Sequence, residues 1–162
     1  MRTLLLASIP ALLPVIGAAQ DLAQAAPDPE VERIYREGEK AYQAGAIAKA
    51  VALFTEVLKQ DPDHVNAYLQ RGFCFTMQRE YVKAVADFTA VIDRKSDHLW
   101  AYTSRGSAYA KLGKHDLAMR DFDRVIELDP KNEEAFNNRG WSKKATGDVK
   151  DSCADKKNSK KI

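Results

Sequence analysis

The side chains best suited to metal or acid–base chemistry are scattered along this chain. Its three histidines are His64, His98 and His115, and no two of them have the i, i+4 spacing that places two imidazoles on one helix face. No Gly-rich phosphate loop is present, and no nucleophile stands beside a base. The sequence therefore predicts no enzyme, no cofactor and no metal site, and we expect the histidines to be exposed loop and helix-start residues.

Three arginines each have an aspartate sixteen residues further along the chain. The pairs are Arg71 with Asp87, Arg105 with Asp121, and Arg139 with Asp155. The first repeat has Glu37 and Leu53 at these two positions, and so has neither the arginine nor the aspartate. The two residue types therefore occur together or not at all. This joint occurrence predicts a structural ion pair in which the planar guanidinium donates two hydrogen bonds to the carboxylate. We expect Arg105 and Asp121 to approach within about 4 Å.

A repeat in the sequence predicts the secondary-structure elements that position these residues. The stretch 101–130 matches 67–96 when it is shifted by 34 residues. The matching residues are Tyr102, Arg105, Gly106, Tyr109, Ala118, Phe122 and Val125 with Tyr68, Arg71, Gly72, Phe75, Ala84, Phe88 and Val91. Further matches extend upstream over 34–62 and downstream over 136–140. Self-similarity at one period is typical of an array of stacked repeats.

This pattern, with glycine and an aromatic residue on one helix followed by Ala and Phe on the next, resembles the tetratricopeptide repeat over about residues 29–157. The resemblance implies an all-α fold, a right-handed α-solenoid of antiparallel helix pairs. The expected segments are full repeats at 29–62, 63–96 and 97–130, a partial repeat at 131–157, and a basic tail at 158–162. The fourth repeat is expected to fray, because Lys143, Ser152 and Lys156 stand where the pattern has apolar residues.

Capping and turn residues set the expected helix bounds. Asp28, Asp63, Asp97 and Asn132 indicate helix starts, and the breaks fall at glycines, at prolines and at residues 78–80. The expected helices span 30–43, 46–59, 65–78, 81–94, 99–112, 115–128, 133–146 and 149–157. Glycine inside a helix costs about 1 kcal/mol against alanine, so the resemblance implies that Gly72 and Gly106 are needed for close contact with Phe88 and Phe122.

Residues 1–19 have the composition of a secretory signal peptide. Arg2 is their one charged residue, an uncharged run follows from Leu4 to Ile16, and small residues end at Ala19. We expect cleavage after Ala19, a linker over 20–28, and a periplasmic or secreted protein without stable membrane insertion. A retained membrane anchor is the alternative, which the short apolar run disfavours.

Composition and charge restrict the class of partner. The chain has 162 residues, is 45% hydrophobic and 30% charged, and carries a net charge of +2. Lys156, Lys157, Lys160 and Lys161 contribute +4, so the charges of all other residues sum to −2. The basic character thus belongs to a tail, and nucleic acid is not an expected partner.

The two cysteines are expected to stay unbridged. Cys74 falls on the first helix of the second repeat and Cys153 on the second helix of the fourth. Packed helices lie about 8–10 Å apart, whereas a disulfide needs Cα atoms within about 7 Å. We expect Cys74 to be a buried apolar residue and Cys153 to be exposed, where it could link two molecules.

The first helix of each repeat carries a second stripe, beyond its packing positions. In the resembled family this stripe lines a concave groove that binds peptides and partner proteins. The candidate groove residues are Tyr35, Glu39, Tyr42, Asn66, Leu69, Phe73, Trp100, Thr103, Ser107, Asn137 and Trp141. Exposed aromatic residues beside amides and hydroxyls are typical of recognition surfaces. The alternative is structural, with Trp100 covering a turn and Trp141 capping the last interface.

The family also contains a clamp for C-terminal carboxylates, which requires asparagine where this chain has Glu39 and Phe73. A partner of that class is therefore not expected. The sequence predicts a non-enzymatic interaction module that binds a peptide or protein partner in a concave aromatic groove. Two alternatives stay open, an assembly protein that self-associates through its end repeats and a binder of a small cell-envelope ligand.

Overall fold

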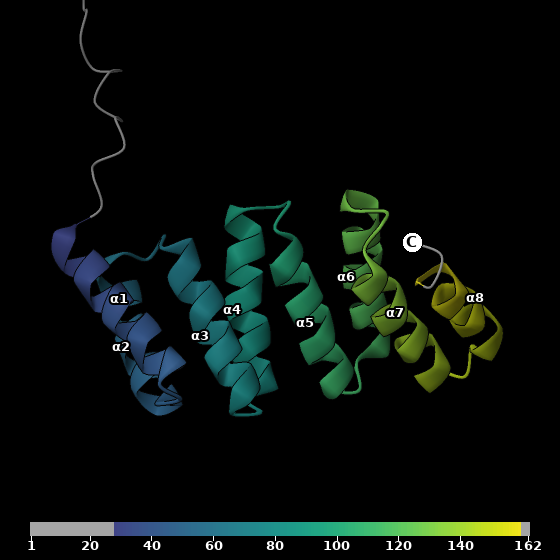
Figure 1. The fold of residues 1–162 in the computed structure, drawn as a ribbon, viewed down its shortest axis with the longest axis horizontal. Helices are drawn as coiled ribbons and strands as arrows, with labels where there is room; N and C mark the ends of the chain where they lie inside the picture. The colour runs from purple at the N-terminus through teal and green to yellow at the C-terminus, as the bar shows by residue number, and fades with distance from the viewer. Residues whose placement is uncertain (1–27, 160–162) are drawn as a thin grey trace, which may run out of the picture.

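The computed structural model describes residues 28–159, which form eight helices and no strand. The helices are α1 (Pro29–Gln43), α2 (Ile47–Gln60), α3 (Val65–Met77), α4 (Tyr81–Arg94), α5 (Leu99–Lys111), α6 (His115–Leu128), α7 (Glu133–Ala145) and α8 (Val149–Ser159). They follow one another as antiparallel pairs along the long axis of the molecule (Figure 1). The expected all-α solenoid is confirmed, and every expected helix bound is met within two residues. The proposed signal peptide and residues 160–162 of the tail lie outside the described residues.

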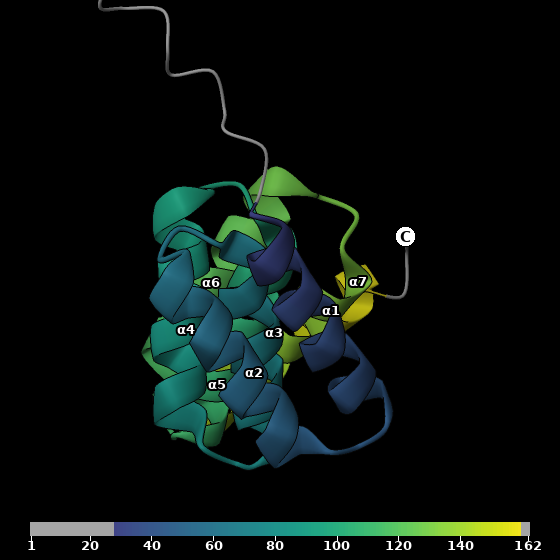
Figure 2. The ribbon, with the colours of Figure 1, turned by 90° about the vertical axis from the view of Figure 1, so that its left-hand side faces the viewer.

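The helices pack in chain order along the array. Seen from its N-terminal end, α1 and α7 lie on one side and α4 and α6 on the other (Figure 2). Each second helix also packs against the first helix of the next pair, and the first helices contact one another along the array. The first helices thus present a continuous row of side chains.

Each of the first three pairs is centred on one phenylalanine. Phe54, Phe88 and Phe122 are at most 1% exposed. A Cβ atom added to Gly72 would lie 2.7 Å from Cε1 of Phe88, and one on Gly106 would lie 2.8 Å from Cε1 of Phe122. Real Cβ contacts are not this short, so the expected reason for these glycines is confirmed.

The inter-repeat helix starts differ from the expectation. Asp28 caps α1 as expected, but α3 and α5 are capped by His64 and His98, whose Nδ1 atoms accept from the amides of Ala67 and Ala101 at 3.1 and 3.2 Å. The assignment of Asp63 and Asp97 as caps was wrong by one residue. Asn132 does the same for α7 through its side-chain oxygen, so one capping position is shared by all three helices.

The turns inside the pairs require a left-handed backbone. Gly45, Gly113 and Gly147 have φ values of 73°, 73° and 92°. The second repeat has Arg79 at this place, with φ of 61°. A non-glycine residue in this conformation costs roughly 1–2 kcal/mol, so the turn between α3 and α4 is the strained member of the set.

The expected arginine–aspartate pairs are formed in all three places. Arg105 donates from Nε and Nη2 to the two oxygens of Asp121 at 2.9 and 2.7 Å, and its Nη1 donates to Thr89 of the preceding repeat at 3.1 Å. Arg71 repeats this arrangement with Asp87 and Thr55. Each arginine therefore joins the two helices of its own pair and the second helix of the pair before.

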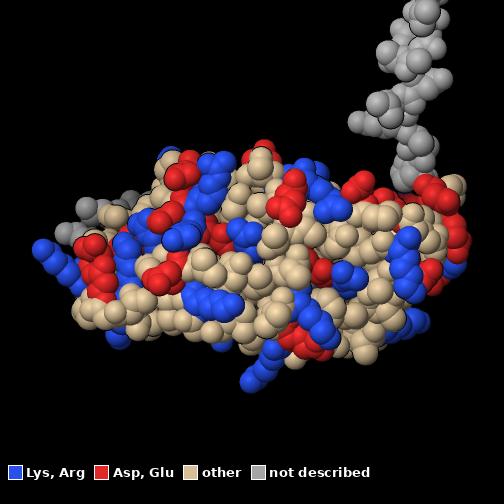
Figure 3. Space-filling view, turned by 180° about the vertical axis from the view of Figure 1, so that it is seen from behind, with Lys and Arg blue, Asp and Glu red and all other residues tan. Residues whose placement is uncertain are grey.

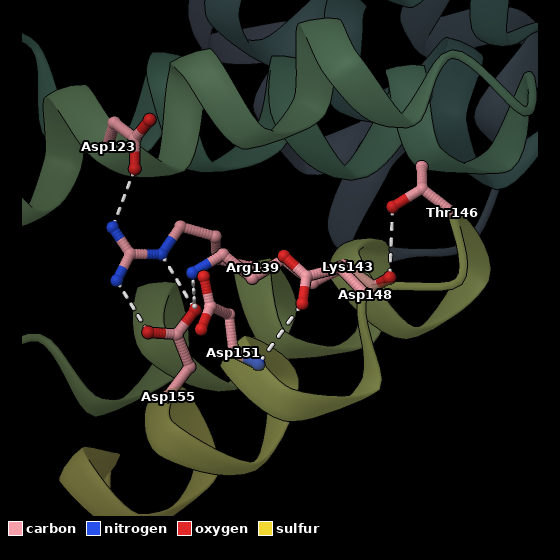
Figure 4. A network of polar contacts seen from close by, with 7 residues as sticks. All are labelled: Asp123, Arg139, Lys143, Thr146, Asp148, Asp151 and Asp155. Atoms are coloured by element: carbon pink, nitrogen blue, oxygen red, sulfur yellow. Dashed lines mark hydrogen bonds and ion pairs between the residues drawn. The ribbon is translucent and has the colours of Figure 1, made fainter.

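The fourth pair is joined by polar side chains. Arg139 lies between Asp123 on α6 and Asp155 on α8, with Nη1 and Nη2 contacts of 2.6 Å each (Figure 4). Lys143 adds an ion pair to Asp155 at 2.9 Å. Ser152, which we expected to weaken this helix, is 2% exposed, as is Asp155. The helix α8 continues to Ser159, so the expected end near residue 157 was too early.

Charges of both signs are interspersed on the face shown in Figure 3, among broad uncharged areas. No helix in the part of the chain that the structure describes has the length and apolar character needed to cross a membrane.

Candidate functional site

The candidate stripe lies on the four first helices, α1, α3, α5 and α7, and is called the inner stripe below. Its members differ in exposure from one repeat to the next. Asn66, Trp100, Asn137 and Trp141 are exposed, whereas Glu39, Tyr42, Leu69, Phe73 and Ser107 are half-buried and Tyr35 and Thr103 are buried. The structure thus separates residues available to a partner from residues that are part of the fold.

Tyr35 belongs to the core, which corrects its assignment as an exposed aromatic anchor. Its side chain is 9% exposed, and its ring centroid lies 5.6 Å from Phe54 and 4.8 Å from His64. Burial, with a contribution from the carboxylate of Glu39, raises the pKa of the Tyr35 phenol. The imidazole of His64, which caps α3, packs against the Tyr35 ring.

Phe73 is partly structural as well. Its ring packs edge-on against Phe88 at a centroid distance of 5.5 Å, and with Leu69 it covers the core of the second pair. Thr103 is 7% exposed, and its hydroxyl donates to the backbone carbonyl of Leu99 at 3.0 Å. These contacts explain why the two side chains are not fully accessible.

The two tryptophans are the large exposed side chains of the inner stripe. Trp100 is 66% exposed on α5, and Trp141 is 55% exposed on α7. The ammonium of Lys144 lies 5.6 Å from the Trp141 ring centroid, within cation–π range. Neither indole is buried in a repeat interface, which disfavours the structural alternative for both residues.

A pocket of about 260 Å³ opens beside Trp141. Its lining includes Ser107 from α5, His115 and Phe122 from α6, and Asn138, Trp141 and Ser142 from α7. This pocket is called the Ser107 pocket below. Three helices therefore converge on one concave site at the C-terminal end of the inner stripe.

His115 is the member of this site that sequence reasoning missed. We expected an exposed histidine, but its Nδ1 atom is buried and has no hydrogen-bond partner among the described residues. The repeat offset held a signal for this, because His115 is equivalent to Tyr81 and Ile47, both of them large and half-buried side chains. A polar ring at an otherwise apolar position is a reason to look for a partner.

The two cysteines are free, as expected. Cys74 is buried on α3, where burial raises the pKa of its thiol to about 11. Cys153 is exposed on α8. Within residues 28–159 there is also no group of three or more His, Cys, Asp or Glu side chains that could hold a metal ion.

Comparisons with protein families identify the repeat. Two family models, both described as tetratricopeptide repeat, match residues 35–98 and 99–132. A comparison with curated protein sequences gives no match.

Several solved structures share the fold. The crystal structure of MamA superposes with a TM-score of 0.78 at 21% identity, covering 81% of this chain and 77% of that one. The structure of MamA 41-end from Desulfovibrio magneticus RS-1 gives 0.78 at 22% identity, with 81% and 74% covered. The first TPR of Spaghetti (RPAP3), bound to the HSP90 peptide SRMEEVD, gives 0.69 at 25% identity, with 72% and 93% covered.

These findings support a protein-interaction module, and proteins of this kind are generally non-enzymatic. The two family models together span more than half of the chain, over the same residues that form the helix pairs. The chain belongs to the tetratricopeptide repeat family.

Proposed function

We propose that this chain is a non-enzymatic module that binds a peptide or protein partner along the inner stripe. The observation that carries the proposal is the pair of exposed tryptophans, 66% and 55% accessible, on one stripe with the exposed amides of Asn66 and Asn137. Exposed aromatic residues supply binding free energy, and amides align a peptide backbone. The peptide-bound repeat of Spaghetti (RPAP3) supports this use of the fold.

The partner should differ in charge from the peptide in that structure. The HSP90 peptide SRMEEVD has three acidic residues and one basic residue. In the chain described here Glu32, Glu39 and Glu134 lie along the first helices, and Glu39 and Phe73 occupy the places of the family's clamp asparagines. A neutral or basic segment is therefore a better match for these helices than a strongly acidic one.

Selection of a random peptide library on the folded chain from residue 20 onwards tests this function. Peptides that bind are then measured by calorimetry against Trp100→Ala, which should weaken binding by about 1–3 kcal/mol, the range of an aromatic interface anchor. Val82→Ala is the matched control, because Val82 is 70% exposed but lies on a second helix, α4. Equal affinity of the two variants for every selected peptide would exclude the inner stripe as the binding face.

Self-association is the second candidate function. Val149 is 56% exposed on α8, the last helix of the described part, and Cys153 is exposed on the same helix. Light scattering of the folded chain separates the two functions. A self-assembling protein forms a dimer or larger species as the concentration rises, and Val149→Lys should prevent it.

We also propose that the protein is exported. The support is the composition of residues 1–19, with one cation, a short apolar run and small residues before Gln20. Intact-mass measurement of the protein from its native host should give an N-terminus at or near Gln20. An uncleaved chain in the cytoplasmic fraction would exclude export.

A further inference from the structure

We infer that the Ser107 pocket is a subsite for one tyrosine side chain of the partner, a specificity that rests on the proposed peptide binding. The inference starts from a comparison of neighbouring repeats. Phe73 of α3 packs its ring edge-on against Phe88 at 5.5 Å. The residue equivalent to Phe73 in the next repeat is Ser107, and the pocket lies beside this smaller side chain. Phe122 borders the pocket but is itself only 1% exposed.

The first repeat covers its phenylalanine in a different way. There, Tyr35 packs on Phe54 at 5.6 Å. The equivalent of Tyr35 in the third repeat is Thr103, whose hydroxyl is turned to the carbonyl of Leu99. Both positions that could place an aromatic ring over Phe122 are therefore occupied by small hydroxyl residues.

The volume suits a single substituted ring. A cavity of about 150 Å³ is enough to bind benzene, and the Ser107 pocket measures about 260 Å³. A ring entering beside Trp141 would restore the aromatic contact that Phe73 makes with Phe88. Such aromatic pairs favour edge-on or offset geometry and contribute beyond the area that they bury.

The polar lining selects a hydroxyl on that ring. His115 borders the pocket, and its Nδ1 atom is buried without a hydrogen-bond partner among the described residues, so a hydroxyl on the bound ring is the group that we expect to reach it. A neutral imidazole has one nitrogen that donates and one that accepts, whereas a hydroxyl does both and can therefore pair with either tautomer. Asn138 and Ser142 provide further donors and acceptors in the same wall. Phenylalanine would leave the Nδ1 atom of His115 unpaired, which costs free energy because this atom is shielded from water.

The test uses p-cresol, which is the side chain of tyrosine, and toluene, which is that of phenylalanine. Amide NMR spectra of the folded full chain should show saturable p-cresol shifts at Ser107, Asn138 and Ser142, and binding of toluene should be roughly fivefold weaker, as one lost hydrogen bond predicts. Long-range proton–nitrogen spectra of His115 should shift with p-cresol. Shifts that do not saturate, or equal affinity for both probes, would overturn the inference.

Two variants locate the site. Ser107→Phe reproduces the second repeat and should abolish p-cresol binding, while Ser107→Ala leaves the pocket open and should retain it. Ser107→Leu replaces the phenylalanine variant if that variant loses helicity. His115→Phe should reduce the preference for p-cresol over toluene to about one. Unchanged p-cresol binding in every pocket-filling variant would show that the ring binds elsewhere.

The outcome separates this subsite from the proposed function. Saturable p-cresol binding blocked by Ser107→Phe, together with no peptide that depends on Trp100, would retain the subsite and remove the proposed function. Peptides that depend on Trp100 but show no enrichment of tyrosine and no sensitivity to Ser107→Phe would retain the function and remove the subsite.

Discussion

The two halves of the inner stripe have the same helical framework but are filled differently. In the α1 and α3 half, aromatic side chains pack on the central phenylalanine of each repeat, Tyr35 on Phe54 and Phe73 on Phe88. In the α5 and α7 half, Phe122 borders an open pocket and the exposed tryptophans lie nearby. The aromatic side chains outside the packing pattern are thus part of the core in one half and are exposed in the other.

Charge does not follow the same division. Glu32 and Glu39 lie on α1, Lys111 lines the Ser107 pocket and Lys144 lies over Trp141, but Glu133 and Glu134 begin α7. The α5 and α7 half therefore carries charges of both signs, and the difference between the halves is one of packing.

The largest expected effect compares the two central phenylalanines. Phe88→Ala should lower the free energy of unfolding by about 4 kcal/mol, in the range for buried phenylalanine. Phe122→Ala should cost about 1 kcal/mol less, because an aromatic pair like that between Phe73 and Phe88 is worth roughly 0.5–1.5 kcal/mol. Both residues are equally inaccessible, at 0% and 1% exposed, so urea unfolding of the two variants isolates the packing difference. Equal losses would mean that the halves are packed alike.

The second prediction concerns acid sensitivity, which should be concentrated at the C-terminal end. Burial opposes ionisation of Asp155, but its bonds from Arg139 and Lys143 outweigh this and hold the pKa of that carboxyl below its ordinary value of 3.8. Because the folded-state pKa is lowered, the stabilisation is present above pH 3.8 and is lost as the pH falls further through the folded-state value. In Asp121, burial dominates and the pKa is raised in spite of Arg105.

Lys143→Gln checks this prediction. The variant should lose about 1–2 kcal/mol of stability at pH 7, since one charge-assisted hydrogen bond to Asp155 is removed. The difference from the parent chain should disappear once the pH falls below the lowered folded-state pKa of Asp155. Lys144→Gln is the control, because Lys144 lies over Trp141 and not beside Asp155. A loss that is independent of pH would show that Lys143 acts through packing alone.

A third prediction uses the shared capping position. His98→Ala should destabilise the fold by about 1 kcal/mol, the usual value of a lost N-cap, because the amide of Ala101 loses its acceptor. His98→Asn should restore the stability, since Asn132 performs the same role in the next repeat. Thermal unfolding of both variants decides the point, and an equally destabilised His98→Asn would assign the effect to lost imidazole packing.

The sequence alone was sufficient for the framework. The period of 34 residues predicted the helix pairs, the close contacts of Gly72 and Gly106, and the bidentate arginine–aspartate pairs, because each depends on residues that recur at fixed positions. It could not predict the capping by His64 and His98, since aspartate immediately before each histidine is the stronger cap on propensity. Nor could it show that the fourth pair would be held by Lys143 and Asp155 instead of apolar contacts.

The candidate site was predicted less well, because the stripe positions are not constrained by the repeat. Tyr35 and Trp100 were both assigned to the groove by spacing, yet one is 9% and the other 66% exposed. The difference in exposure arises because Tyr35 packs against Phe54, whereas Trp100 is not covered by the core. Spacing along the sequence does not show such packing. The Ser107 pocket could be suspected only by comparing the small residues Thr103 and Ser107 with their aromatic equivalents upstream.

The smallest expected effect would convert one half of the molecule into the other. Ser107→Phe places a ring where Phe73 lies in the preceding repeat, and filling the pocket of about 260 Å³ should raise the free energy of unfolding by about 0.5 kcal/mol. The gain is small because the pocket is open to solvent and the buried Nδ1 of His115 stays without a partner. The double variant Ser107→Phe with His115→Tyr, which also restores the equivalent of Tyr81, should therefore gain more than the sum of the two single changes. Additive or destabilising changes, measured by urea unfolding, would show that the third repeat cannot adopt the packing of the second and that its pocket has another structural cause.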